Sequence, residues 1–354
     1  MSNKIMYITD IHYGAYPVCR KDDYNDSILN KLKFCLDVAY DEGIKLVFLG
    51  GDLFDRPNQT FGDMTKLIYA LKPYSKHMRF LTNKGNPTHD GNDKNSPLTF
   101  LNTVMDKFTI VNNLKIDHLS HFSMITKVTP TQSIMDDMNK FKVFNDDLSY
   151  DADVMFVHNT SKLSEIEIHK NPKCKNDKLF IFTHHIISKE KVPYEHVLME
   201  DFANELKEKN NKQYKNIYVF VADYHPYQGI IFDYVGETGV VFVAPGSIAR
   251  RKYTKDNIEK VPHYAIVEWD INSGNFGIKI GDVECEKDVW HLPEKNQKVM
   301  NTELDMQTFQ DELSDFEEEL DFKASWKKFA ATINVSEEVA KELNERLFGE
   351  KKND

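Results

Sequence analysis

The stretch that decides the fold is residues 4–12, which read KIMYITDIH. Its first six residues are mostly apolar and favour β-structure, so residues 4–9 are predicted to form a strand. Asp10 and His12 follow at once, on alternate residues of a segment expected to be extended, which would turn both side chains to the same side. The other motifs of the chain repeat this placement of metal-binding residue types at the end of a strand.

Four more motifs each follow a short apolar run that is typical of a buried strand. Between the first strands, residues 24–42 and 63–71 have helical spacing. Strands that alternate with helices predict an α/β layered domain, in which the strand-end loops meet at one edge of the sheet. The four motifs are Gly51-Asp52, Gly85-Asn86, Thr183-His184-His185 and Asp223-Tyr224-His225.

Together the motifs offer carboxylates, imidazoles and one amide, which suit a site for two divalent cations. Asp52 is the natural bridge between the cations, because a carboxylate has two oxygens to share. His185 is an alternative to His184, while His158 is expected not to bind metal. The other expected ligands are Asp10, His12 and His225 on the first metal and Asn86, His184 and Asp223 on the second.

The order of these motifs resembles that of the calcineurin-like metallophosphoesterases and, within that superfamily, of the SbcD-type DNA-repair nucleases of cells and phages. The resemblance covers about residues 4–270. It implies a β-sandwich flanked by helices, two divalent ions that are most readily Mn²⁺ with Mg²⁺ as the alternative, and hydrolysis of phosphodiesters in DNA. The supporting stretches are YITDIHYG at 7–14, GDLFD at 51–55, PGSIAR at 245–250 and HYAIVE at 263–268.

The first departure from the family pattern is an insertion in its Gly-Asn-His-Asp motif. Residues 85–90 read GNPTHD, with Pro87 and Thr88 added. The resemblance implies that His89 is the general acid and that Asp90 orients it. Either the loop bulges and returns His89 to the site, or the acid is displaced. A surface histidine in a polar loop is the alternative.

The second departure is Asp223, where the family usually has histidine. Carboxylate oxygen suits Mn²⁺ or Mg²⁺ at least as well as imidazole does, so Asp223 is expected to be a ligand that favours harder ions. The alternative is a turn residue beside a weak second metal.

The negative charge of the chain is concentrated in one segment. The formal net charge is −11, but residues 301–322 hold nine acidic residues and no Lys or Arg, and the first 300 residues carry only −3. A basic groove is therefore compatible with the composition. Arg250 and Arg251 are expected to contact substrate phosphates, with a solvated basic loop as the alternative.

The chain is expected to contain a nuclease domain at 1–250, a short capping or closing β region at 251–295, an acidic linker at 296–323 and a helical tail at 324–354. An apolar stripe in residues 326–347 would suit a helix-in-groove contact. By resemblance, this tail docks on an SbcC-type coiled-coil ATPase. The alternatives are a tail that folds back on the nuclease core and a homodimer.

Several features favour a cytoplasmic protein, in the host cytoplasm if the chain is phage-encoded. The four cysteines are scattered, no apolar run reaches the roughly 18–20 residues that span a membrane, and the chain enters a strand soon after Met1. The expected function is that of a DNA nuclease subunit in repair, recombination or replication, with no membrane partner. The alternatives are a small-substrate phosphodiesterase or phosphatase of the same superfamily and a catalytically decayed interaction protein.

Overall fold

The computed structural model of the protein describes residues 2–91, 96–111, 113–114, 116–120, 123–124, 152–170, 177–233, 236–270, 276–286 and 289–290. The chain divides into two units, residues 1–291 and 292–354, and all described residues belong to the first. The expected acidic linker (296–323) and helical tail (324–354) therefore lie outside the described residues.

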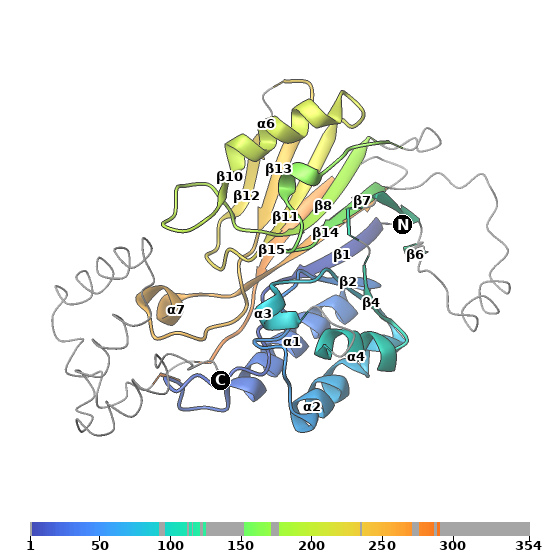
Figure 1. Cartoon of the computed structure of the whole chain (residues 1–354). Coiled ribbons are helices and arrows are strands. Elements are labelled where there is room, and N and C mark those ends of the chain that lie inside the picture. The colour runs from blue at the N-terminus through green and yellow to red at the C-terminus, as the bar shows by residue number, and fades with distance from the viewer. Residues whose placement is uncertain are drawn as a thin grey trace, which may run out of the picture. The chain divides into compact units, whose positions relative to one another are not determined.

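The first sheet has six strands in the order β15-β14-β1-β2-β3-β4 (Figure 1). Four neighbouring strands, β1 to β4, are parallel, as expected from the alternation of strands and helices in this part of the sequence. On the other side of β1, the last two strands are antiparallel. The strands are β1 (Ser2–Ile8), β2 (Leu46–Leu49), β3 (Arg79–Thr82), β4 (Phe108–Ile110), β14 (His263–Asp270) and β15 (Phe276–Asp282).

The second sheet has seven strands in the order β12-β13-β11-β8-β7-β5-β6. Its central strands β13, β11, β8 and β7 are parallel, and antiparallel strands flank them at both ends. The strands are β5 (Ile116–Ser120), β6 (Ser123–Met124), β7 (Ala152–Val157), β8 (Lys178–His184), β11 (Asn216–Ala222), β12 (Gly229–Asp233) and β13 (Gly239–Ala244). A separate pair is β9 (Ile187–Ser188) with β10 (Val197–Leu198).

Helices cover the outer face of each sheet. In Figure 1, α1 (Tyr24–Asp41), α2 (Phe61–Leu71) and α4 (Pro97–Val104) lie on the side of the first sheet, and α6 (Met199–Asn210) lies on that of the second. Buried residues of the first three helices share one apolar cluster with the first sheet, while those of α6 share another with the second. The 3-10 turns Tyr74–Lys76 (η1) and Leu163–Glu165 (η2) and the short helices α3 (Pro87–Asp90) and α7 (Lys255–Glu259) complete the described helices. None of the described helices is long and apolar enough to cross a membrane.

A third apolar cluster joins the inner faces of the two sheets. Along β1, Ile5 and Tyr7 belong to this inner cluster, as expected from the alternation of side chains in a strand. The ring of Phe182 on β8 stacks on Phe48 of β2 with centroids 4.2 Å apart, and on Phe220 of β11 at 4.4 Å. Aromatic stacking thus fixes one sheet against the other.

The expected α/β class is confirmed as two mixed sheets flanked by helices. Within the expected closing β region at 251–295, β14 and β15 pair antiparallel. Its strand β14 pairs with β1 in the register Ile5↔Val267, so β14 and β15 extend the first sheet. Among the described residues, Cys19, Cys35 and Cys285 are free.

Candidate metal centre

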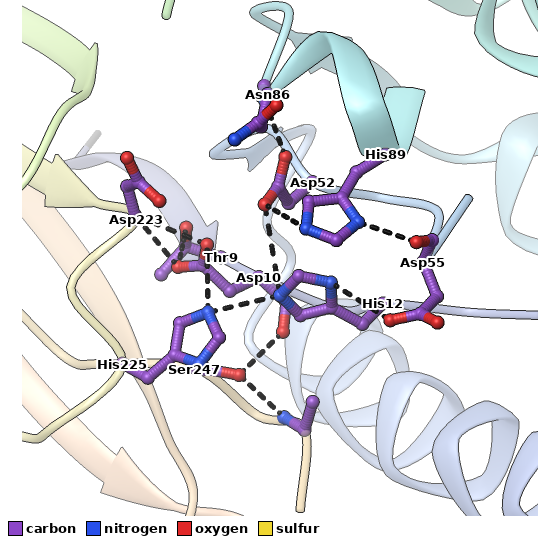
Figure 2. Close-up of polar contacts among 12 residues, drawn as sticks. Thr9, Asp10, His12, Asp52, Asp55, Asn86, His89, Asp223, His225 and Ser247 are labelled. Atoms are coloured by element: carbon purple, nitrogen blue, oxygen red, sulfur yellow. Dashed lines mark hydrogen bonds and ion pairs between the residues drawn. The ribbon is translucent and has the colours of Figure 1, made fainter. Parts of the chain in front are cut away.

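The carboxyl ends of strands from both sheets hold a cluster of acidic and imidazole side chains, the strand-end cluster (Figure 2). It contains two overlapping groups whose possible ligand atoms lie within 4.8 Å of one another: Asp10, His12 and His225, and Asp10, Asp52 and His184. Asp10 is common to both groups. Six of the seven expected metal ligands contact one another in or beside these groups. They are Asp10, His12, Asp52, His184, Asp223 and His225.

The backbone at four of these positions is left-handed. Asp10, His12, Asp52 and Asp223 have φ of 50°, 49°, 46° and 72°. The sequence predicted an extended segment after β1, and this prediction is wrong. The backbone turns sharply at both Asp10 and His12. A left-handed non-glycine residue is uncommon and costs about 1–3 kcal/mol. Such strain at four candidate ligands is typical of a functional site.

Asp52 faces imidazoles on two sides. Its Oδ1 lies 3.3 Å from His184 Nε2, and its Oδ2 lies 3.8 Å from His12 Nε2. The backbone amide of Asn86 also donates to Oδ1 at 2.6 Å. The loops meet closely here: a Cβ at Gly85 would lie 2.2 Å from the backbone nitrogen of Asp52, so only glycine fits. The two-sided placement of the carboxylate agrees with the expected bridging role.

His184 is held with one ring nitrogen directed at carboxylates. Its Nδ1 donates to the carbonyl oxygen of Gly50 at 2.7 Å. The buried Nε2 has no hydrogen-bond partner among the described residues, and it lies 3.9 Å from Asp223 Oδ1 and 4.0 Å from Asp10 Oδ1. Burial opposes the charged imidazolium, but Asp52, Asp10 and Asp223 outweigh it and raise the pKa of His184 well above its usual value. A buried nitrogen among three carboxylates fits a cation position.

The other two imidazoles of the cluster meet at their Nε2 atoms. Those of His12 and His225 lie 3.1 Å apart, and His225 Nε2 is 3.8 Å from Asp10 Oδ1 (Figure 2). Burial lowers the pKa of His12 well below its usual value and lowers that of His225 to about 3. Both rings are thus neutral, which is the form that binds metal.

Asp10 is a buried carboxylate with two other carboxylates, Asp52 and Asp223, close by. Burial, helped by Asp52 and Asp223 and opposed by His184, raises the pKa of Asp10 to about 7. The Thr9 hydroxyl donates to its Oδ2 at 2.7 Å, and the Asp223 amide donates to both oxygens at 3.2 Å. The buried carboxylates of Asp10 and Asp52 lie near the neutral imidazoles of His225 and His12. A divalent cation between these groups would stabilise the negative charge of both carboxylates.

The loop at 245–250 ties two ligand segments together. The Ser247 hydroxyl donates to the backbone oxygen of Asp10 at 2.7 Å, and the Ser247 amide donates to the backbone oxygen of His225 at 3.1 Å. The PGSIAR stretch therefore positions ligands from both sheets.

The inserted Pro87 and Thr88 form the first turn of α3. Proline suits the first position of a helix, and the side chain of Asn86 caps it by accepting from the Thr88 amide at 3.0 Å. The turn returns His89 to the cluster: its ring packs edge-on against His12 with centroids 4.8 Å apart, and its Nε2 lies 3.8 Å from Asp52 Oδ2. The Asn86 amide oxygen also accepts from the Thr88 hydroxyl at 2.8 Å, so both of its lone pairs are used by the cap and the expected ligand Asn86 does not offer this oxygen to a metal here.

Asp90 has a different contact from the one expected. Its two carboxylate oxygens accept from the amides of Phe54 (3.1 Å) and Gly85 (2.9 Å), so it fastens two ligand loops together. His89 is instead oriented by the backbone oxygen of Asp55, 2.5 Å from its Nδ1. The resemblance to the family motif predicted that Asp90 orients His89. The inserted Pro87 and Thr88 change the backbone before His89, so the contacts of the uninterrupted motif do not carry over.

Asp55 is a site residue that the sequence reasoning missed. Its Oδ1 lies 3.6 Å from His12 Nδ1 and pairs with the guanidinium of Arg251. His12, Asp55 and His89 form a third group of possible metal ligands. The only sequence signal was a second carboxylate three residues after Asp52.

The two arginines expected to contact substrate differ. Arg251 lies beside the strand-end cluster, because its guanidinium pairs with Asp55, which in turn faces His12. Arg250 is buried, and its guanidinium donates to the backbone oxygens of Asn257 (2.9 Å), Glu286 (3.0 Å) and Ile258 (2.6 Å). The expectation that Arg250 binds substrate is therefore corrected: it holds backbone segments together.

Two other histidines point away from the cluster. His185 has Thr183 Oγ1 at 2.7 Å from Nδ1 and the Ser161 backbone oxygen at 2.6 Å from Nε2. His158 Nε2 lies 3.1 Å from the backbone oxygen of Val111. Of the two adjacent histidines, His184 is the one directed into the cluster.

Comparison of the chain with protein-family models and with curated proteins gave no match.

Proposed function

We propose that the protein is a metal-dependent phosphodiesterase of the calcineurin-like metallophosphoesterase superfamily that hydrolyses DNA. The observation that carries the proposal is the convergence of two Asp/His groups that share Asp10, with the Nε2 of His184 unpartnered among the described carboxylates. Two mixed sheets flanked by helices, with the candidate ligands at strand ends, are consistent with the fold that the sequence resemblance implies.

The residues suit two divalent cations, Mn²⁺ or Mg²⁺. Asp10, His12 and His225 would hold one cation, and Asp10, Asp52 and His184 would hold the second, with Asp223 adjacent. Asp52 also faces the first group, since its Oδ2 lies 3.8 Å from His12 Nε2. Bound in this way, the cations would polarise the phosphoryl oxygens and activate a water.

His89 has the placement of a general acid. Its Nδ1–H donates to the backbone oxygen of Asp55, which leaves Nε2 toward the interior of the cluster, 3.8 Å from Asp52. This distance is too long for a hydrogen bond, so when the ring is the imidazolium, with a proton on each nitrogen, its Nε2–H is available to give a proton to a leaving oxygen. Arg251 is positioned through Asp55 to stabilise negative charge on a phosphate.

The experiment is a Mn²⁺-dependent assay on linear DNA that compares wild type with Asp52→Asn. Loss of the Asp52 carboxylate, which faces the imidazoles of both His12 and His184, should lower the rate by more than about 10³-fold. The exposed Asp106→Asn is the matched control and should keep wild-type activity. Equal rates in wild type and Asp52→Asn would contradict the proposal. Hydrolysis of bis-p-nitrophenyl phosphate without DNA cleavage would point to a small-substrate enzyme.

His89→Ala tests the acid separately. Its loss should lower the rate by about 10²–10⁴-fold. Full activity in this variant would remove the role of His89 and leave the metal site standing.

The proposed partner is an SbcC-type ATPase, which the apolar stripe at 326–347 would contact. Adding such an ATPase should stimulate DNA cleavage by the full chain. Stimulation that survives replacement of Leu343 and Leu347 by Asp would contradict docking through this stripe.

A further inference from the structure

A groove of about 450 Å³ opens directly beside the candidate metal centre. His225 lines one end of it and also belongs to the Asp10–His12–His225 group. A strand whose phosphate reaches the strand-end cluster would therefore pass this groove. The other lining residues used below are Tyr227, Thr254, Asn257, Lys260 and His263.

Tyr227 gives the groove an exposed aromatic wall. Its ring stacks on His263 with centroids 4.1 Å apart and planes 24° apart, yet the residue is 50% exposed. Gly229 lies close behind: it has φ of 79°, and a Cβ there would lie 3.2 Å from Tyr227 Oη. The ring is thus held on one face, and its exposed half is a ready stacking surface.

Lys260 places an amine in the same groove, which an anion would hold in its charged form. Its Nζ donates to the Ala249 backbone oxygen at 3.2 Å, which uses one of three donors. Among the described residues, no carboxylate lies within ion-pair distance of this ammonium. Burial lowers the pKa of Lys260 to about 7, and Asp10 opposes the shift. An anion in the groove would supply the missing counter-charge.

We propose that this groove is the subsite for the nucleotide that flanks the scissile phosphate, with Tyr227 stacking on its base and Lys260 contacting its phosphate. The inference rests on the proposed function and names how a single strand is held. An aromatic face beside an unpaired ammonium is the combination by which proteins bind single strands with little sequence preference. Thr254 and Asn257, which are hydrogen-bonded to each other at 3.0 Å, add polar groups to the lining, and Glu259 adds a carboxylate.

The first test is the steady-state cleavage of a fluorescein-labelled oligo-dT strand in Mn²⁺. Tyr227→Ala should raise the KM about 10-fold, with a smaller change in kcat, because the stacking surface is lost. Tyr227→Phe keeps the ring and should restore the wild-type KM. The matched control is Tyr69→Ala, which removes a tyrosine that is 70% exposed on α2, away from the groove.

The second test is the salt dependence of binding. Lys260→Met removes one phosphate contact, so the slope of log Kd for the oligonucleotide against log salt should fall by about 0.7. Lys260→Arg should keep the slope. Lys33→Met, which removes an exposed charge on α1, should also keep it. Thermal melts of each variant exclude misfolding as the cause.

The outcomes separate this inference from the proposed function. If the wild type cleaves the strand and both Tyr227→Ala and Lys260→Met match it in KM and salt slope, the groove inference is wrong and the nuclease proposal stands. If the wild type does not cleave DNA, the proposed function fails. Fluorescence anisotropy of the same strand then decides the groove: a tenfold weaker Kd in Tyr227→Ala supports it, and an equal Kd overturns it.

Discussion

Two clusters of buried charge lie in the first unit, and they differ in whether groups of the same kind crowd together. The arginine cluster consists of Arg20, Lys31 and Arg250 around Trp290. Arg20 donates to the Arg250 backbone oxygen at 3.0 Å, Lys31 lies 3.2 Å from Glu286 Oε2, and Arg250 reaches three backbone oxygens. Both arginines also lie over the Trp290 ring. Each cation of this cluster faces an oxygen.

In the strand-end cluster, groups of the same kind crowd together instead. His184 Nε2 faces three carboxylates, and the Nε2 atoms of His12 and His225 face each other. Three carboxylates around one imidazole nitrogen, and two imidazole nitrogens that face each other, destabilise a fold unless a further ligand separates them. The comparison teaches that burial and charge alone do not identify a site. The crowding of like groups, which a bound cation would relieve, does.

The largest expected effect is the loss of stability when the arginine cluster is broken. Arg250→Met should lower the free energy of unfolding by about 3–4 kcal/mol, because the buried guanidinium and its bonds to three backbone oxygens are lost. Urea unfolding measures the loss. The exposed Lys252→Met is the control and should change little. Unchanged stability together with weaker DNA binding would return Arg250 to the role of a substrate contact.

The contrast between Arg250 and Arg251 also shows what the sequence could predict. Strand ends and helix spacing follow from local periodicity, so the α/β class and most candidate ligands could be placed in advance. The direction of a long side chain depends on segments far along the chain. Arg250 is held by a carbonyl 36 residues away, and Arg251 pairs with Asp55 at a separation of 196 residues.

The loop at His89 shows a second limit. The sequence left open whether the insertion of Pro87 and Thr88 displaces the acid. The outcome depended on whether the added residues formed a helical turn, with Asn86 as its cap. This turn returns His89 to the cluster, but leaves its orientation to the backbone oxygen of Asp55 and not to Asp90. Backbone contacts of this kind carry no sequence signature.

The next effect is stabilisation of the strand-end cluster by metal. Mn²⁺ at a hundredfold excess over its Kd should raise the free energy of unfolding by about 2.7 kcal/mol for each occupied site. His184→Ala should lose most of this gain, whereas His185→Ala should keep it, because both His185 nitrogens face other groups. Calorimetric melts with and without EDTA measure the shift. An equal shift in the two variants would show that His184 is not a ligand.

A smaller effect on the free energy of unfolding is expected when the charge of Asp10 is removed from the metal-free protein. Because the pKa of Asp10 is raised to about 7 in the folded protein, folding takes up a proton between about pH 4 and 7, and this carboxyl makes metal-free stability fall as pH rises through that range. His184, whose pKa is raised above its usual value, binds more proton in the folded state above about pH 6.5 and so adds to the fall of stability as pH rises there. Asp10→Asn should therefore gain about 1–2 kcal/mol over wild type between pH 5 and 8. The measurement is urea unfolding in EDTA at several pH values, and parallel curves for the two proteins would contradict the crowding of charge at Asp10.

The smallest effect concerns the choice of metal at Asp223, whose side chain is only 20% exposed and lies 3.9 Å from His184 Nε2. Imidazole suits Mn²⁺ better than Mg²⁺, while carboxylate suits both. Asp223→His should therefore keep Mn²⁺-dependent hydrolysis within about tenfold of wild type and lower the ratio of the Mg²⁺ rate to the Mn²⁺ rate. Asp106→His, on the surface, should leave that ratio unchanged. If the ratio is also unchanged in Asp223→His, Asp223 is a turn residue that crowds the cluster without binding metal. A cation at His184 would then be held by the carboxylates of Asp10 and Asp52 alone.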